Sequence, residues 1–481
     1  MDNYTKGRRF AYRLLATALS AGTAGMAHAA HPGDIDGTFG PGGYVTNDFF
    51  GSNEQVFALA PMRDGRFVAV GKVVATNITG NGSSENMAIA RYLPNGTLDS
   101  SFGSGGLVNI DVDSASDEAR AVRVMADNGL LVAGTLSTSA HADFGIVKLR
   151  ADGALDTTFG ETDIGSTRKG YVRLDIAGVN FHDSGYAMAV QKDGRIVVAG
   201  TTPVFHDGFN YNQVALARFS ADGVLDTTFG SGGVVKLDPF FGAAGDVLTT
   251  IALDQAGNPG TDGRIVIGGY TFGRNCAFLA RVNANGSVDT TFGTGGRVIL
   301  VDANASGVRT GMSLLYSARL AADGKIIALG QGGDRGMTVM RFSANGTLDS
   351  GFGTAGRSTI KFSGVADYDM PAALALQGNG KIVAAGYATS RATGSAHEDF
   401  FVTRWLANGA VDTGFGDANG YKVVQVSTLD DSALAVAVEP SGNILAGGYT
   451  TRPGATQPDF ALLRLIGDPD RIFHDGFDAG F

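Results

Sequence analysis

Histidines beside aspartates are the residues of this sequence best suited to acid–base or metal chemistry. Two such pairs, His182-Asp183 and His206-Asp207, lie in neighbouring polar stretches, apart from a further pair in the C-terminal tail. An imidazole beside a carboxylate can transfer a proton near neutral pH or share a metal ion. The alternative is that these histidines are simply solvated, as surface histidines in polar loops commonly are.

A second set of candidates is acidic and recurs eleven residues before a turn glycine. Its members are Glu54, Glu118, Asp183, Asp246, Asp369 and Asp431, with Ser313 in the remaining place. These side chains could accept backbone N–H bonds and shape a loop, which is the interpretation we favour. They could also form an acidic collar around a central opening and hold a divalent cation such as calcium. No other cofactor is predicted.

Two arginines lie within strand-like segments whose neighbours are Ala, Val and Leu. They are Arg123 and Arg319, and each must line a channel or pair with a carboxylate, so both are candidate binding residues. The sequence contains no GxSxG, HExxH or Walker motif, which are the common signatures of hydrolases, metalloproteases and nucleotide-binding enzymes.

A sequence motif that occurs seven times, called the phrase below, predicts the secondary-structure elements that must position these residues. LDxxFGxGG or a close variant begins at Ile35, Leu98, Leu155, Leu225, Val288, Leu348 and Val411. Between copies lie three apolar runs divided by Asp-Gly or Asn-Gly turns, as in YAMAVQKDG, RIVVAGTT and QVALARFSADG. We name these runs A, B and C, and the phrase with its following residues D. Four such segments predict a four-stranded antiparallel sheet, which must stack on its neighbours to bury both faces.

The phase of the repeat predicts how the ring closes. The chain opens with a D segment, GDIDGTFGPGGYVTND, and ends its last unit, DFALLRLI, without one. We therefore predict an all-β, seven-bladed β-propeller over residues 30–466, closed by the N-terminal strand joining the last blade.

These repeats resemble the bacterial delta-60 repeat of β-propeller proteins, with a blade layout similar to that of NHL units. The resemblance is carried by the LDxxFGxGG phrase and the GRIVVAG-type segment, and it extends over about 35–466. It implies the fold and export from the cell, and it implies no catalytic residue.

A basic residue at the end of each C segment predicts a repeated ion pair with the Asp of the phrase. The basic residues are Arg91, Lys148, Arg218, Arg281, Arg341, Arg404 and Arg464. The aspartates are Asp99, Asp156, Asp226, Asp289, Asp349, Asp412 and, for closure with Arg464, Asp36. A residue required once in every blade is architectural rather than catalytic.

The ends of the chain bear on location and partners. Residues 1–29 combine a basic front, a short apolar run and Ala-His-Ala, the pattern of a signal peptide. We expect an exported protein in the periplasm, on the cell surface or outside the cell, without a membrane span. Its removal leaves 33 basic against 46 acidic residues, which disfavours nucleic acid as a partner. Residues 467–481 form a polar C-terminal tail.

Antiparallel order places the A–B and C–D turns on one face and the irregular B–C and D–A loops on the other. Variable loops on a rigid scaffold usually carry binding. We therefore favour a monomeric, non-catalytic binding or scaffold protein that uses the B–C and D–A loop face for a glycan, a peptide or a cell-surface protein. The alternative is a hydrolase or lyase using acidic, His and Arg groups at a central funnel.

Overall fold

The computed structural model describes residues 31–49, 52–76, 83–162, 168–178, 181–206, 208–238, 245–254, 263–271, 276–301, 311–332, 336–361, 369–390, 397–455 and 457–468. The chain divides into two units, Met1–Ala30 and His31–Phe481. The predicted signal peptide and most of the predicted tail lie outside the described residues.

In the described ranges every regular element is a β-strand, and the strands form seven four-stranded antiparallel sheets. Blades one to four follow the chain. Blade one comprises β2 (Glu54–Pro61), β3 (Phe67–Thr76), β4 (Ser83–Tyr92) and β5 (Leu107–Ile110). Blade two comprises β6 (Glu118–Val124), β7 (Leu130–Ser137), β8 (Ala142–Leu149) and β9 (Tyr171–Leu174). Blade three comprises β10 (Ser184–Val190), β11 (Ile196–His206), β12 (Phe209–Phe219) and β13 (Val234–Leu237). Blade four comprises β14 (Asp246–Asp254), β15 (Arg264–Thr271), β16 (Cys276–Val282) and β17 (Arg297–Val301).

The last three blades complete the set, and the seventh takes its fourth strand from the front of the chain. Blade five comprises β18 (Leu314–Leu320), β19 (Ile326–Gln331), β20 (Met337–Phe342) and β21 (Arg357–Ile360). Blade six comprises β22 (Asp369–Leu376), β23 (Ile382–Ser390), β24 (His397–Trp405) and β25 (Tyr421–Val424). Blade seven comprises β26 (Asp431–Val438), β27 (Ile444–Thr450), β28 (Asp459–Leu465) and β1 (Tyr44–Asn47).

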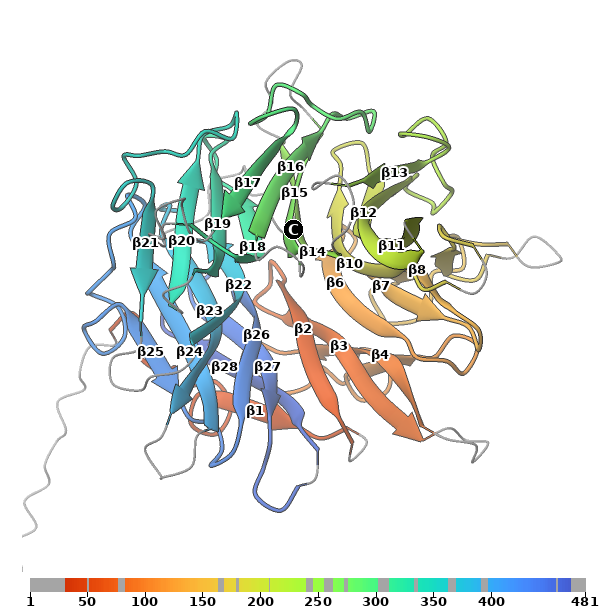
Figure 1. Cartoon of the computed structure of the whole chain (residues 1–481). Helices are drawn as coiled ribbons and strands as arrows, with labels where there is room; N and C mark the ends of the chain where they lie inside the picture. The colour runs from red at the N-terminus through yellow and green to blue at the C-terminus, as the bar shows by residue number, and fades with distance from the viewer. Residues whose placement is uncertain are drawn as a thin grey trace, which may run out of the picture. The chain divides into compact units, whose positions relative to one another are not determined.

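The seven sheets surround one axis, with β2, β6, β10, β14, β18, β22 and β26 innermost (Figure 1). Each innermost strand packs against the next, and β26 packs against β2. The buried core forms seven clusters, each shared by two neighbouring blades; one joins Val70 and Ile89 of blade one to Val132 and Val147 of blade two. The alternating Val, Ala and Leu of the A, B and C segments thus fill the spaces between sheets, and the predicted seven-bladed all-β propeller is confirmed.

Closure joins the two ends of this unit in one sheet. β1 pairs with β28 in the register Tyr44↔Leu463, and Gly33 N donates to Ile466 O at 2.8 Å. The side chain of Arg464 contacts Asp36, Nε to Oδ2, at 2.8 Å. The unpartnered first copy of the phrase is therefore the outer strand of the last blade.

The repeated basic residue and the Asp of the phrase form an ion pair in every blade. Arginine Nε lies 2.8 or 2.9 Å from Asp Oδ2 in Arg91–Asp99, Arg218–Asp226, Arg281–Asp289, Arg341–Asp349, Arg404–Asp412 and Arg464–Asp36. Lys148 Nζ lies 3.0 Å from Asp156 Oδ2. The phrase phenylalanine packs against the same cation; the guanidinium carbon of Arg91 is 4.5 Å from the ring centroid of Phe102.

The arginines also reach beyond their own blades. Arg91 Nη1 donates to Ala151 O in the C–D turn of blade two at 2.5 Å, and Arg218, Arg281, Arg341 and Arg464 make the corresponding contact with the following turn. Beside this contact, Gly103 N donates to Asp152 O at 2.8 Å. Gly103 has a φ of +54°, and an added Cβ would lie 2.4 Å from Leu107 O, so this position requires glycine. The phrase therefore links neighbouring blades.

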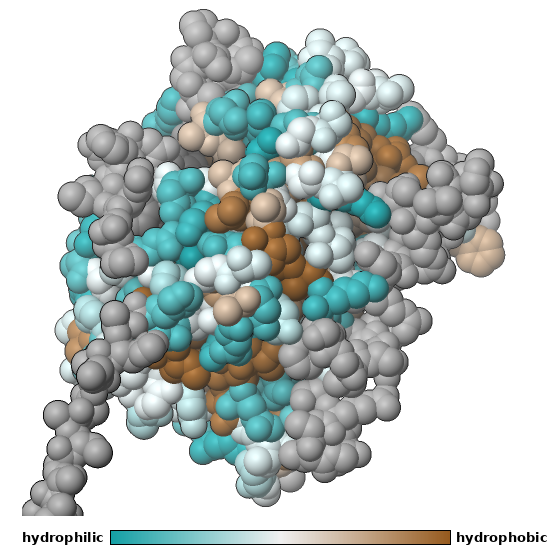
Figure 2. Space-filling model, turned by 90° about the vertical axis from the view of Figure 1, so that its left-hand side faces the viewer, coloured by the Kyte–Doolittle hydropathy of each residue, from teal (hydrophilic) through white to brown (hydrophobic). Residues whose placement is uncertain are grey.

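On the side of the molecule that carries β21 and β25, the exposed hydrophobic residues form separate patches and not one continuous surface. Figure 2 shows hydrophobic patches there, separated by hydrophilic residues. Several exposed apolar residues, such as Val288 and Leu348, belong to the repeated turns. No helix found among the described residues combines the length and apolar character needed to cross a membrane.

Candidate functional site

A β-bulge interrupts the innermost strand of every blade, at a matching place near its loop-facing end. The register of strands A and B skips one residue in each sheet. The skipped residues are Phe57, Arg120, Tyr186, Thr249, Tyr316, Ala372 and Leu434. A bulge re-aims the side chain of its extra residue, and bulges are common beside functional sites.

Four of these residues and three tyrosines near the ends of B strands lie at the loop-facing ends of the A and B strands, and we call this set of seven the axial aromatic ring. Its members are Phe57, Arg120, Tyr186, Tyr270, Tyr316, Tyr387 and Tyr449. All seven side chains are partly exposed. They come from all seven blades in turn, because each blade contributes one member.

The contacts run from blade to blade. The guanidinium carbon of Arg120 lies 3.9 Å from the ring centroid of Phe57 and 5.9 Å from that of Tyr186. The centroids of Tyr270 and Tyr316 are 6.2 Å apart. Burial raises the pKa of both these tyrosines, and neighbouring phenols raise it further.

The remaining tyrosines continue the ring. Burial raises the pKa of Tyr387 to about 12, with contributions from Glu398 and Tyr449. The pKa of Tyr449 is also raised by burial. These phenols therefore stay protonated at physiological pH and offer O–H donors among partly exposed aromatic side chains.

Charged groups flank the ring at blades one and two. Lys72 Nζ lies 2.6 Å from Glu85 Oε1 and 3.5 Å from Glu118 Oε1. Arg120 Nη2 lies 2.6 Å from Glu118 Oε2. Alternating donors and acceptors thus stand beside the aromatic faces of Phe57 and Tyr186.

Glu398 provides the corresponding acid at blades six and seven. Its Oε2 accepts a hydrogen bond from Tyr449 Oη at 3.4 Å and another from Ser432 Oγ. Burial raises the pKa of Glu398, with Asp430 adding to the effect. A carboxyl group in this environment can carry a proton closer to neutral pH than an ordinary glutamate.

The predicted carboxylates serve mainly as acceptors for the loops. Glu54 accepts the N–H of Phe49 at 2.9 Å, Asp183 that of Ile176 at 2.6 Å, and Asp431 that of Val426 at 2.8 Å. Glu54, Asp183, Asp246, Asp369 and Asp431 are all buried. This placement supports loop shaping rather than an open collar.

In blade two the residue that accepts the loop N–H lies one position before the predicted residue. Asp117, not Glu118, accepts the loop N–H, from Val112 at 2.6 Å, and it also accepts Ser137 N at 2.8 Å. Glu118 is the first residue of β6, and its side chain forms an ion pair with Arg120 instead. The spacing to the glycine misidentified the loop acceptor because Asn128, with a φ of 63°, takes the turn position in blade two that Gly65 takes in blade one, one residue before Gly129.

The two arginines of the inner strands lie far from the loop face. Arg123 is the last but one residue of β6 and Arg319 the last but one of β18, so both stand at the A–B turn end. Five residues separate Glu118 from Arg123, which corresponds to about 16 Å along a strand. Arg319 Nη1 donates to Ala318 O at 3.0 Å. Both arginines therefore stand at the opposite end of the inner strand from the acidic residue at its start, and their part in a central funnel stays a prediction.

Of the two histidine pairs, only His182-Asp183 lies wholly within the described residues. His182 is exposed and its Nδ1 accepts Ala142 N at 3.1 Å, whereas Asp183 is buried in its own loop. The side chain of His206 and the whole of Asp207 lie outside the described residues. The hairpin that carries them exposes 70% of Phe205 and 64% of Phe209.

The axial aromatic ring was not predicted from the sequence. One signal was available, because a Gly-Tyr dipeptide ends the B segment in GGYT, AGYAT and GGYTT. The bulge residues share no residue type, so only the strand register reveals their common position.

Comparisons with known proteins agree with this architecture. Six segments match the family model described as "Domain of unknown function (DUF5122) beta-propeller", at residues 64–102, 126–159, 191–229, 260–292, 321–352 and 377–415. Each runs from an A–B turn to the Phe of the phrase, and the seventh unit is divided between the front and the end of the propeller. The chain is a repeat β-propeller protein. No curated protein matches it.

Solved structures resemble the chain only distantly. An α-L-arabinofuranosidase, Arb93A, from Fusarium graminearum is 9% identical with a TM-score of 0.40, over 88% of this chain and 97% of that one. The NanB sialidase from Streptococcus pneumoniae is 11% identical with a TM-score of 0.37, over 88% and 70%. An intramolecular trans-sialidase from Ruminococcus gnavus is 12% identical with a TM-score of 0.39, over 87% and 97%. We draw no functional conclusion from similarities at this level.

Proposed function

We propose that this propeller is an exported, non-catalytic binding protein that holds a carbohydrate at the loop-facing side of the axis. The observation that carries the proposal is the axial aromatic ring, in which partly exposed aromatic side chains lie beside charged pairs and protonated phenols. Aromatic faces accept the apolar face of a sugar, and nearby donors and acceptors accept its hydroxyl groups.

The chemistry of the ring favours a polyhydroxylated ligand over an apolar one. Arg120, Lys72 and the phenols donate hydrogen bonds, while Glu85, Glu118 and Glu398 accept them. A ligand with many hydroxyl groups can satisfy both kinds of group without leaving a buried charge unpaired.

The proposal is tested by binding on an array of neutral and acidic oligosaccharides, followed by titration of the best ligand. Tyr270→Ala and Tyr316→Ala should each weaken binding about tenfold, since a lost aromatic contact costs about 0.5–1.5 kcal/mol beyond its buried area. Phe209→Ala, in the exposed hairpin on the same face, is the matched control and should bind as the wild type does. Capture of no oligosaccharide, or dependence on Phe209 instead of the ring, would overturn the assignment.

One observation favours an enzymatic alternative. Glu398 is partly buried with a raised pKa and lies against Ser432 and Tyr449, as a general acid could. The same ligands distinguish the two functions. Release of new reducing ends by the wild type but not by Glu398→Gln would show a glycan-cleaving enzyme, whereas binding without cleavage in both supports the non-catalytic function.

A further inference from the structure

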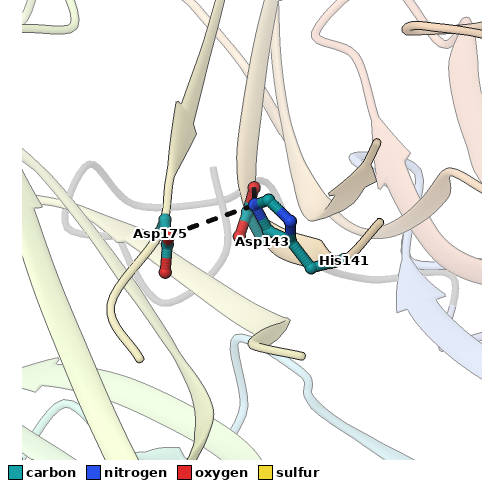
Figure 3. Close-up of side chains that lie close together, drawn as sticks. All are labelled: His141, Asp143 and Asp175. Atoms are coloured by element: carbon teal, nitrogen blue, oxygen red, sulfur yellow. Dashed lines mark ion pairs between the residues drawn. The ribbon is translucent and has the colours of Figure 1, made fainter. Parts of the chain in front are cut away.

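Three side chains with metal-ligating atoms meet at the outer edge of blade two. His141 directly precedes β8, Asp143 is the second residue of β8, and Asp175 directly follows β9. His141 Nε2 lies 3.3 Å from Asp143 Oδ2 and 3.9 Å from Asp175 Oδ2. Figure 3 shows the two carboxylates and the imidazole pointing toward one another. One ligand atom from each residue lies within 4.8 Å of the others.

Strand register brings the two carboxylates together. Phe144 pairs with Leu174, so Asp143 and Asp175 occupy the next opposite positions of β8 and β9. Blade seven has the same arrangement, because Phe460 pairs with Asn47 and places Asp459 opposite Asp48. There Arg452 contacts both acids, with Nη2 3.1 Å from Asp48 Oδ2 and Nε against Asp459 Oδ2.

Blade two lacks that bridging arginine. Alignment of the B strands at Gly134 and Gly448 puts Thr138 where blade seven has Arg452. Thr138 Oγ1 lies 3.3 Å from His141 Nδ1. In the tautomer with its proton on Nδ1, His141 donates to Thr138 and directs the lone pair of Nε2 toward Asp143, which is the arrangement that metal-binding histidines need.

Asp143 supplies a second, independent indication of a ligand. Only 1% of its side chain is exposed, and its Oδ1 has no hydrogen-bond partner among the described residues. A buried carboxylate oxygen without a partner is costly. Burial raises the pKa of Asp143 to about 6.

The surrounding charge is negative. Arg173 Nε lies 3.6 Å from Asp143 Oδ2, but Arg173 Nη1 is engaged by Asp113 at 2.6 Å. Asp183 also raises the pKa of Asp143, after burial and other charges. Arg173 is therefore shared between Asp113 and Asp143, and Asp175 and Asp183 add further negative charge near Asp143 that a divalent cation could balance.

We propose that His141, Asp143 and Asp175 bind a divalent metal ion of the zinc class. Ligand atoms around tetrahedral zinc at 2.0–2.2 Å are about 3.4 Å apart, close to the 3.3 and 3.9 Å observed here. One nitrogen and two carboxylate oxygens suit zinc better than calcium, which prefers six to eight oxygen ligands. Asp175 is the most exposed of the three residues, with 31% of its side chain exposed, so water or an oxygen of a ligand could complete the coordination from that side.

The test is calorimetric titration of the purified chain, stripped of metal with EDTA and dialysed, using ZnCl₂ and separately CaCl₂. We expect one zinc ion per chain, weaker calcium binding and a zinc-dependent rise of Tm. Asp175→Asn should weaken zinc binding at least about tenfold and abolish the rise of Tm, since even partners outside the first ligand shell change metal affinity by 10- to 100-fold.

Asp48→Asn is the matched control, because it removes the equivalent acid of the pair that Arg452 bridges. It should bind zinc as the wild type does. Equal Tm values of the metal-free wild type and Asp175→Asn chains would verify that the variant is folded. Absence of zinc binding by the wild type, or the same affinity in Asp175→Asn, would overturn the proposal. Equal losses in both variants would also overturn it.

Discussion

Arg281 illustrates how single residues of the phrase stabilise the ring. Its Nε pairs with Asp289 Oδ2 at 2.8 Å, its Nη1 donates to Ala344 O of the next blade, and its guanidinium carbon lies 4.8 Å from the ring centroid of Phe292. Only 5% of the Arg281 side chain and 4% of the Asp289 side chain are exposed. Breaking a buried pair leaves an uncompensated charge, which costs more than the intact pair contributes.

Arg281→Met should therefore lower the free energy of unfolding by about 3 kcal/mol, since removal of one partner of a buried pair typically costs 3–5 kcal/mol and Arg264, 3.3 Å from Asp289, remains as a second cation. Urea unfolding measures the change. Arg150→Met removes an exposed pair, with side chains 56% and 62% exposed, and should cost less than about 1 kcal/mol. Equal losses in the two variants would contradict an architectural role for the repeated pair.

Arg281→Lys adds a graded comparison, because Lys148 occupies the equivalent position of blade two. Lysine keeps the ion pair but cannot also reach the next turn with a second nitrogen. Its stability should lie between those of Arg281→Met and the wild type.

At the scale of elements, the strand pairing β1–β28 converts an open row of sheets into a ring. Gly416 N donates to Pro32 O at 3.0 Å, which is the contact that Gly40 makes with Asn95 and Gly103 with Asp152. Residues 31–47 therefore replace both the missing C–D turn and the missing fourth strand. Without them β28 would present an unpaired edge.

A circular permutant should fold like the wild type. The permutant begins at Ser52, and a copy of the turn at residues 94–97 joins Ile466 to Ile35. The Asn carbonyl of this copied turn can accept the hydrogen bond that Gly416 N donates to Pro32 O in the wild type. We expect its Tm to lie within a few degrees of the wild-type value. A chain truncated before Ser52, without the transplanted segment, should aggregate or unfold at a much lower temperature. Size-exclusion chromatography and thermal unfolding compare the two, and an undiminished Tm in the truncated chain would show that closure is dispensable.

For the molecule as a whole, carboxyl groups with opposite pKa shifts set the pH dependence of stability. The hydrogen bond from Thr228 lowers the pKa of Asp226 to about 2 against the effect of burial, and the pKa of Asp99 is also about 2, because Ser101 and Arg66 outweigh its burial. Burial raises the pKa of Asp117 to about 7 and that of Asp143 to about 6. The lowered groups stabilise the fold above about pH 4, and this contribution is lost as the pH falls toward 2.

The carboxyl groups whose pKa is raised change the stability in the opposite direction. Between about pH 4 and 7 the folded chain keeps protons that the unfolded chain has released, so stability falls as the pH rises through this range. In EDTA, the free energy of unfolding should therefore be greatest near pH 4–5 and lower at pH 7.5 by on the order of 2 kcal/mol. Asp143→Asn should remove the part of this decline below about pH 6.5. A stability that increases steadily from pH 4.5 to 7.5 would contradict the assigned shifts.

The blade count, the strand order and the repeated ion pair could all be predicted from the sequence. These features depend on contacts within one unit or between adjacent units, and the phrase from Leu98 to Gly106 carries the Asp, Phe and Gly that make them. Such short-range requirements recur in every copy, so the residues themselves display them.

The candidate sites were decided by the tertiary structure. Phe57 and Tyr449 belong to blades that are neighbours only because the ring closes, and the bulge residues, such as Arg120, Tyr186 and Leu434, have no residue type in common. Asp143 and Asp175 face each other because β8 and β9 pair in one register. The length of the segment that connects the two strands does not by itself predict the distance between these side chains. Each site combines side chains from separate strands, and a repeat pattern specifies each strand without specifying which side chains meet between them.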